Sequence, residues 1–251
     1  MTKGSTPVRR RRVVPEVSVI LATRNHEAFL PQCVESLLKQ TLPRSQYEVV
    51  VVNDDSTDGT AHVLARYGRA LVTVQLPQHA GLARACNEGL HRARGEFVMR
   101  VDSDDWLEPD ALEQAVAAMR QHPETDILLA DYWAERPRGR ARIQMDARNV
   151  FSWTAAGVLM RTRMLRDAGG YRPLFWEESD LYLRLLSRGA RAMRLARPLW
   201  HYRKHAAGMT ASRTARTAGW QELLRAWPTA TLQRFGSHQE LAAALAQAGG
   251  R

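Results

Sequence analysis

Two acidic clusters follow short apolar segments of the chain. Residues 53–55 (Asn-Asp-Asp) come directly after segment 47–52, and residues 102–105 (Asp-Ser-Asp-Asp) come directly after segment 96–101. An isolated Asp-x-Asp is a weak signal, because Asp and Ser are ordinary loop residues. Both apolar segments, however, are typical of buried strands, and the carboxyl ends of parallel strands open on one ligand-binding crevice. We therefore expect the two clusters to share a pocket.

Carboxylates that share a pocket repel each other and raise one another's pKa. A bound divalent cation removes this conflict, and hard oxygen ligands favour Mg²⁺ or Mn²⁺. The sequence therefore predicts a metal-binding pocket in which Asp102 and Asp104 are the first candidate ligands.

Strands and helices alternate around these clusters. Periodicity predicts strands at 17–23, 47–52, 70–76, 96–101 and 126–133, and helices at 27–40, 58–67, 81–94 and 109–122. Pro31 falls in the first turn of its helix, where proline costs little. This alternation predicts an α/β fold with a mostly parallel sheet that helices cover on both faces.

The remaining segments are less regular. Residues 136–148 are rich in arginine and are expected to form a solvated hairpin or flap, 164–168 and 179–188 to be helical, and 192–202 to be extended. A helix around Trp220 ends at Pro228, and Ser237 with Glu240 has the pattern of a capping box before a last helix, which Gly249 closes. The Trp220 helix could lie on a membrane, although such a stripe more often closes a core.

The charge of the chain lies at its ends. The 251 residues include 36 Lys and Arg and 26 Asp and Glu, a net charge of +10, of which segments 1–16 and 203–251 carry +4 and +5. Only two cysteines occur, apolar segments are far shorter than a membrane span, and no secretion signal follows the basic start. We expect a cytoplasmic globular protein without a nucleic-acid partner, whose basic ends could contact an anionic membrane.

Five segments, taken in order, resemble the family 2 glycosyltransferases of the GT-A fold. They read VSVILATRN, VVVNDDSTDGT, GLARACNEG, GEFVMRVDSDDW and FWEESDLYLRL, and the resemblance covers roughly residues 15–210. It implies a Rossmann-like sheet with a nucleotide-binding half at 17–105 and an acceptor half at 106–210. A basic, disordered leader at 1–16 and a helical extension at 211–251 complete the predicted organisation.

The resemblance also implies an activity. Such an enzyme moves a sugar from a nucleotide sugar, here of the UDP or dTDP type, to a saccharide or lipid-linked acceptor in polysaccharide synthesis. Carried over by position, the family roles make Asp104, with Asp102 and His205, the metal ligands. They assign contact with the nucleotide or its sugar to Thr23, Arg24, Glu27, Asp54, Arg84, Asp102, Ser103 and Arg203. Asp55 stands where the family often has Gly, and Arg24 where it often has an aromatic residue, which leaves the identity of the base open.

The acceptor hydroxyl must lose a proton as it attacks, which calls for a positioned carboxylate. By resemblance this base is Glu178, where the family more often has Asp, and the reaction inverts the anomeric centre. Glu177 and Asp180 are competitors, because acidic residues in a first helical turn also favour the helix dipole.

Several residues have two interpretations. Arg203 and Lys204 could bind the diphosphate, and His205 could ligate the metal, or the segment could be a solvated loop. His201 is expected to pack beside Trp200. Trp153, Trp200 and Trp220 are expected in the core, whereas Trp176 is the best candidate for contact with the acceptor.

Two other classes of function stay open at this point. A sugar nucleotidyltransferase also joins an α/β sheet to a metal and a sugar, but the chain has no Gly-rich basic loop after residues 17–23 to receive a triphosphate. The second class is non-enzymatic binding to nucleic acid or anionic lipid through the basic ends.

Overall fold

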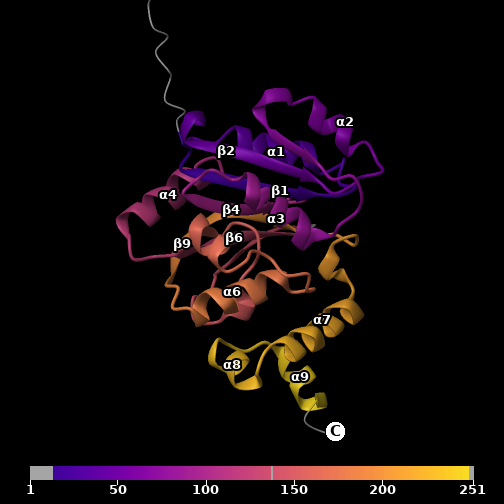
Figure 1. Cartoon of the computed structure of the whole chain (residues 1–251), viewed down its shortest axis with the longest axis vertical. Coiled ribbons are helices and arrows are strands. Elements are labelled where there is room, and N and C mark those ends of the chain that lie inside the picture. Colours follow the sequence, from indigo (N-terminus) through magenta and orange to yellow (C-terminus); the bar gives the residue numbers. More distant parts are fainter. Residues whose placement is uncertain (1–13, 137, 249–251) are drawn as a thin grey trace, which may run out of the picture.

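A computed structural model describes residues 14–136 and 138–248. Its strands form one nine-stranded sheet in the order β3-β2-β1-β4-β8-β6-β9-β5, with β7 paired to β6, within these ranges (Figure 1). The bounds are β1 Val17–Thr23, β2 Tyr47–Asn53, β3 Val72–Gln75, β4 Phe97–Asp102, β5 Trp106–Leu107, β6 Ile127–Arg136, β7 Gly139–Ile143, β8 Leu159–Arg161 and β9 Ala192–Arg203. Strands β1 to β4 are parallel, whereas β8 runs antiparallel to both of its neighbours.

Helices cover both faces of the sheet, as predicted. They are α1 Leu30–Leu38, α2 Thr60–Ala65, α3 Leu82–Arg92, α4 Ala111–Gln121, α5 Thr162–Asp167, α6 Glu177–Ser187, α7 Arg213–Ala226, α8 Thr229–Arg234 and α9 Gln239–Ala248. The first four lie inside the predicted ranges and are shorter by one to three residues at most ends. Pro31 occupies the first turn of α1.

Alternate residues of each central strand enter opposite halves of the core. In β1, Val19 and Leu21 pack in the cluster that contains α1 and α4, whereas Ile20 packs in the cluster that contains α3 and α6. A strand buried on both faces reads as a continuous apolar run rather than an alternating one. This explains why β1 is apolar from Val19 to Ala22 without alternation.

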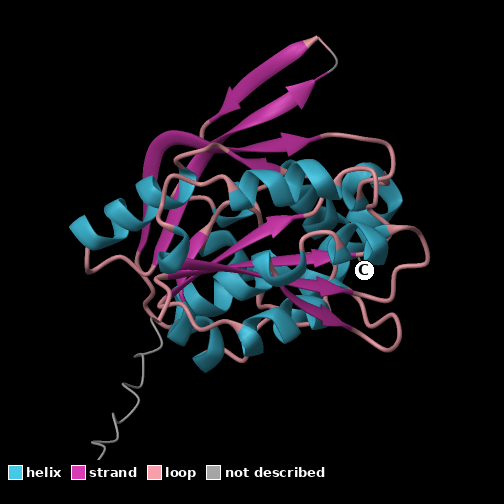
Figure 2. Cartoon of the chain, turned by 90° about the horizontal axis from the view of Figure 1, so that it is seen from above, coloured by secondary structure: helices cyan, strands magenta, loops and turns pink. Residues whose placement is uncertain are grey.

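The arginine-rich segment forms the predicted hairpin. Strand β7 pairs antiparallel with β6, and Figure 2 shows the two strands projecting from the body of the molecule. At the base of the hairpin, the buried carboxylate of Asp131 accepts hydrogen bonds from Arg142, Arg194 and the backbone N–H of Met145. These bonds fix where the hairpin leaves the sheet.

The C-terminal helices pack below α6 (Figure 1). Trp220 and Leu223 of α7 are buried in the core, so the apolar stripe of this helix faces the protein. The capping box predicted from Ser237 and Glu240 is not formed: the Glu240 carboxylate binds Arg216 and Trp220 Nε1 instead. That prediction was wrong because a tertiary ion pair takes the side chain. Gly249 lies outside the described residues.

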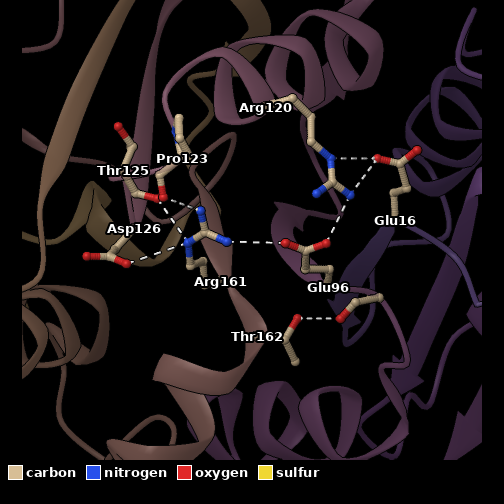
Figure 3. A network of polar contacts seen from close by, with 9 residues as sticks. Glu16, Glu96, Arg120, Pro123, Thr125, Asp126, Arg161 and Thr162 are labelled. Atoms are coloured by element: carbon tan, nitrogen blue, oxygen red, sulfur yellow. Dashed lines mark hydrogen bonds and ion pairs between the residues drawn. The ribbon is translucent and has the colours of Figure 1, made fainter.

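A network of ion pairs lies at the amino-terminal ends of β1 and β4 (Figure 3). Arg120 of α4 binds Glu16 and Glu96, and Glu96 also binds Arg161 of β8. Exposed ion pairs of this kind contribute about 0–1 kcal/mol each. Within the described ranges, none of the helices is long and apolar enough to cross a membrane.

Candidate active site

A cavity of about 380 Å³ opens at the carboxyl ends of the central strands. Its walls come from the ends of β1, β2 and β4, from the start of α3, and from the segment between β9 and α7. The cavity therefore lies where the acidic clusters were expected to meet, at the edge of the sheet opposite the ion-pair network of Figure 3.

Most of the predicted nucleotide and metal residues line this cavity. They are Thr23, Arg24, Asp54, Asp102, Ser103, Asp104, Arg203 and His205. Glu27 and Arg84 are exposed and are absent from the lining; the carboxylate of Glu27 accepts a hydrogen bond from the backbone N–H of Gly59. The three acidic residues of α6 also lie outside the lining.

Asp54 connects two loops at the floor of the cavity. Its Oδ1 accepts a hydrogen bond from the backbone N–H of Ala80 (2.7 Å), and its Oδ2 accepts one from the N–H of Gly81 (2.9 Å) and lies 2.8 Å from His79 Nδ1. A buried carboxylate needs such donors, since an unpaired charge in the interior is costly.

Asp104 and His205 meet although they lie about a hundred residues apart in the chain. His205 Nε2 is 2.8 Å from Asp104 Oδ2, and both side chains are mostly buried. A contact of this length is a hydrogen bond between the two side chains. The carboxylate oxygen and the imidazole nitrogen are also donor atoms that a divalent cation would bind.

The described residues contain no group of three or more His, Cys, Asp and Glu side chains that could hold a metal by themselves. A cation at Asp104 and His205 would thus need water or substrate oxygens to complete its coordination. Mg²⁺ in proteins commonly binds in this way, through one or two carboxylates and the phosphates of the substrate.

Asp105 binds the end of β9. It accepts a hydrogen bond from the backbone N–H of Arg203 at 2.8 Å, and Arg203 Nε donates to the carbonyl oxygen of Asp104. Burial raises the pKa of Asp105 well above its ordinary value, with smaller contributions from Asp102 and Asp104. Arg203 also lies over the ring of Trp106, so its guanidinium is held at the cavity wall.

The acids of α6 have different partners. Glu177 binds Arg100 at 2.7 Å, and Asp180 binds Arg184 at 2.8 Å and accepts a hydrogen bond from Trp227 Nε1. Burial, and next the neighbouring carboxylate of Glu177, raise the pKa of Glu178 well above its ordinary value, although Arg100 opposes this. A carboxyl group with a raised pKa is suited to proton transfer near neutral pH.

The aromatic residues mostly follow the expectation. Trp153, Trp200 and Trp220 are buried in the core, whereas Trp176 is half-buried and packs at a tilt against Trp220, with the ring centroids 4.8 Å apart. His201 is buried, but its ring stacks on Trp106 (4.6 Å) rather than beside Trp200, and it lies between the carboxylates of Glu108 and Glu135.

Two histidines and one arginine that line the cavity were not predicted. His26 Nδ1 lies 2.7 Å from Ser103 Oγ, and His79 contacts Asp54. Both histidines follow strands at the same edge of the sheet, which is the signal that could have found them. Arg100 lies within β4 and carries no such signal, because its partner in α6 is 77 residues away.

The fold and this cavity place the chain among the α/β proteins that bind a ligand at the carboxyl edge of the sheet. The sequence profile named glycosyl transferase family 2 matches residues 18–176. The chain belongs to this family, which confirms the assignment made from the five sequence segments.

Two relatives illustrate the extent of the similarity. EpsH of Bacillus subtilis (strain 168) is 37% identical over 123 residues, which cover 48% of this chain and 35% of EpsH. The poly(ribitol-phosphate) β-N-acetylglucosaminyltransferase TarS of Staphylococcus aureus is 33% identical over 172 residues, 66% of this chain and 29% of TarS. The similarity thus spans about a third of the length of these relatives.

Solved structures confirm the predicted GT-A fold. S. aureus TarS 1–349, in complex with UDP-GlcNAc, superposes with a TM-score of 0.71 and 25% identity, over 92% of this chain and 71% of that one. The mannosyltransferase PcManGT of Pyrobaculum calidifontis, in complex with GDP-Man and Mn²⁺, has a TM-score of 0.70 and 23% identity, over 94% and 75%. The similarity to PcManGT concerns the fold alone.

Proposed function

We propose that this chain is a metal-dependent, inverting glycosyltransferase that moves a sugar from a UDP- or dTDP-type donor to a hydroxyl of a saccharide or lipid-linked acceptor. The pairing of Asp104 with His205 in a cavity that also contains Asp54 and Asp102 is the observation that carries this proposal. The structure of the relative TarS with UDP-GlcNAc supports a uridine-type donor.

The donor would lie across the carboxyl edge of the sheet. Asp54 and Thr23 would contact the base, Asp102 the ribose or sugar, and Asp104 with His205 would hold Mn²⁺ or Mg²⁺ beside the diphosphate. The cation, when bound, stabilises the negative charge that grows on the departing diphosphate. Arg203, whose guanidinium donates to the carbonyl oxygen of Asp104 and lies over Trp106, would place a second positive charge close to it.

Glu178 is our proposed base. Glu177 and Asp180 each form an ion pair with an arginine, whereas burial raises the pKa of Glu178, as suits a carboxylate that must accept a proton. The base must act on the face of the sugar opposite the leaving group, and this is why we propose inversion.

A thermal-shift screen of nucleotide sugars with and without Mn²⁺ tests donor and metal together. We expect one class of donor to raise the melting temperature in the presence of Mn²⁺ and to have little effect without it, because the phosphates complete the coordination of the ion. Equal stabilisation with and without Mn²⁺ would contradict the metal role.

Two substitutions test the roles of the acids. Asp104→Ala should abolish the Mn²⁺-dependent shift, and Glu178→Gln should lower the rate of transfer about 10²- to 10⁴-fold while the shift persists. Asp167→Ala and Glu124→Gln change exposed acids elsewhere and serve as controls. Wild-type rates for both Asp104→Ala and Glu178→Gln would show that the roles are wrongly assigned.

Membrane contact through the basic ends is a separate proposal for the lipid-linked acceptor. Since the apolar stripe of α7 is buried, the proposal rests on the charge of segment 1–16, most of which lies outside the described residues. Flotation with anionic vesicles, for the full chain and for a variant with Arg9, Arg10, Arg11 and Arg12 changed to Ser, tests it. Equal flotation of the two proteins would refute it.

A further inference from the structure

Arg100 is a buried arginine in the middle of the sheet. It lies in β4 two residues before Asp102, so both side chains point to the same face of the strand. Its side chain is only 3% exposed, although it reaches the wall of the cavity. Burial of a guanidinium costs free energy unless carboxylates and hydrogen bonds compensate for the lost water. The partners of Arg100 therefore determine whether its burial is tolerated.

These partners belong to two different parts of the site. Arg100 Nε donates a hydrogen bond to Asp102 Oδ1 (2.8 Å), and its Nη1 donates one to Glu177 Oε1 (2.7 Å). The side chain of Glu177 is 2% exposed, whereas that of Asp102 is 33% exposed and faces the cavity. We call the three residues the Arg100 bridge. It joins the end of β4 to the first turn of α6.

The first turn of α6 needs such an anchor. Its N-cap residue, Trp176, provides no side-chain hydrogen bond to the helix. Two contacts hold this turn from the side of the C-terminal helices. Trp227 Nε1 donates a hydrogen bond to Asp180, and the carboxylate of Glu222 accepts one from the backbone N–H of Phe175. Figure 1 shows α6 between the sheet and α7, so the Arg100 bridge holds the same turn from the side of the sheet.

We propose that Arg100 is a positioning residue, which holds Asp102 and the first turn of α6 in one arrangement. The proposal rests on the function proposed above. In that function Asp102 would contact the donor, and Glu178, next to Glu177, would accept the proton of the acceptor hydroxyl. Arg100 acts through these carboxylates. A small displacement of reacting groups, of about 1 Å, can lower a rate about 10²-fold.

A variant that preserves stability separates positioning from folding. Arg100→Met combined with Glu177→Leu replaces the buried ion pair by apolar side chains, an exchange that is often neutral or stabilising. Amide hydrogen exchange is then followed by mass spectrometry in a peptide that covers residues 174–182. Arg161→Met, in the ion-pair network at the opposite edge, is the control (Figure 3).

We expect exchange in this peptide to rise about tenfold or more in the double variant and to stay at the parent rate in the control, because only the first loses an anchor of α6. Arg100→Lys is a second variant that should fold. Its ammonium keeps the charge but lacks the fork that spans two carboxylates, so it should show the same increase. Parent-like exchange in either variant, at an unchanged urea midpoint, would overturn the proposal.

Kinetics provide the second readout. In Arg100→Lys we expect kcat to fall about 10²-fold, whereas Arg161→Met should keep the parent value. A kcat for Arg100→Lys within about threefold of the parent would overturn the positioning role. The exchange experiment uses no substrate. A parent protein without transfer activity would therefore overturn the proposed function, and unchanged exchange would overturn the Arg100 bridge.

Discussion

Asp54→Asn tests whether the carboxylate of Asp54 holds the floor of the cavity together. The carboxylate offers two oxygens to three donors, which are His79 Nδ1 and the N–H groups of Ala80 and Gly81. An asparagine amide has one oxygen and an NH₂ group that only donates. Whichever way the amide turns, its NH₂ group faces at least one backbone N–H, so at least one hydrogen bond is lost.

The size of the effect follows from burial. The Asp54 side chain is 5% exposed, so water has little access to the abandoned N–H. A buried donor without a partner costs about 1–3 kcal/mol, and the remaining bonds lose the strength that a charged acceptor gives them. We expect the free energy of unfolding to fall by about 2–3 kcal/mol. For a chain of this length that corresponds to roughly 4–12 °C in melting temperature.

Urea unfolding of the full chain, followed by both tryptophan fluorescence and circular dichroism, measures this change. Asp55→Asn is the matched control, because Asp55 is only half-buried and its φ of 54° is one that asparagine tolerates. We expect the control to stay within about 0.5 kcal/mol of the parent. A value for Asp54→Asn within that range, or an equal loss of stability in both variants, would refute this role of the Asp54 carboxylate.

Two further predictions concern other parts of the fold. Gly157→Ala should lower the free energy of unfolding in urea by about 2–5 kcal/mol, because residue 157 has a φ of 73° and a Cβ there would overlap the indole of Trp200. Gly189→Ala is the control: its φ is 89° and the space around it is open, so it should show only the cost of the strained backbone. Burial by itself would raise the pKa of Asp131, but its two arginine partners outweigh this and lower it. The stability that Asp131 contributes is thus present above its unfolded pKa of about 3.9 and is lost as pH falls through the lower folded value. Urea unfolding of Asp131→Asn should therefore differ from the parent most near pH 7 and least in acid, and a pH-independent difference would contradict the ion pairing.

The first half of the fold was predictable because its signals are local. Strands β1, β2 and β4 are mostly apolar and rich in valine, and their alternation with helices indicates a parallel sheet. Strands β5 and β8 were missed, because they have two and three residues and form only through long-range pairing with β9 and β4. Segments this short carry no periodicity.

The site divides in the same way. Asp54, Asp102 and Asp104 were found because each directly follows a strand at the carboxyl edge. The approach of His205 to Asp104 came from the family resemblance and not from any spacing, since the chain must return across the sheet through β9 to bring them together. Arg100 was missed for a comparable reason: an arginine inside an apolar strand says nothing about its distant partner.

The structure also changes the physical reason for expecting a metal. The sequence suggested that uncompensated carboxylates would need a cation, but Arg100 binds Asp102, and the backbone of Arg203 satisfies Asp105. Groups of the protein itself therefore compensate the repulsion between Asp102 and Asp105, so this repulsion alone does not require a divalent ion. The case for a metal rests instead on Asp104 and His205, which offer only two ligands. Because two ligands leave most of the coordination sphere to water and phosphate, the affinity for the ion should depend on the bound diphosphate, and donor and metal should bind together.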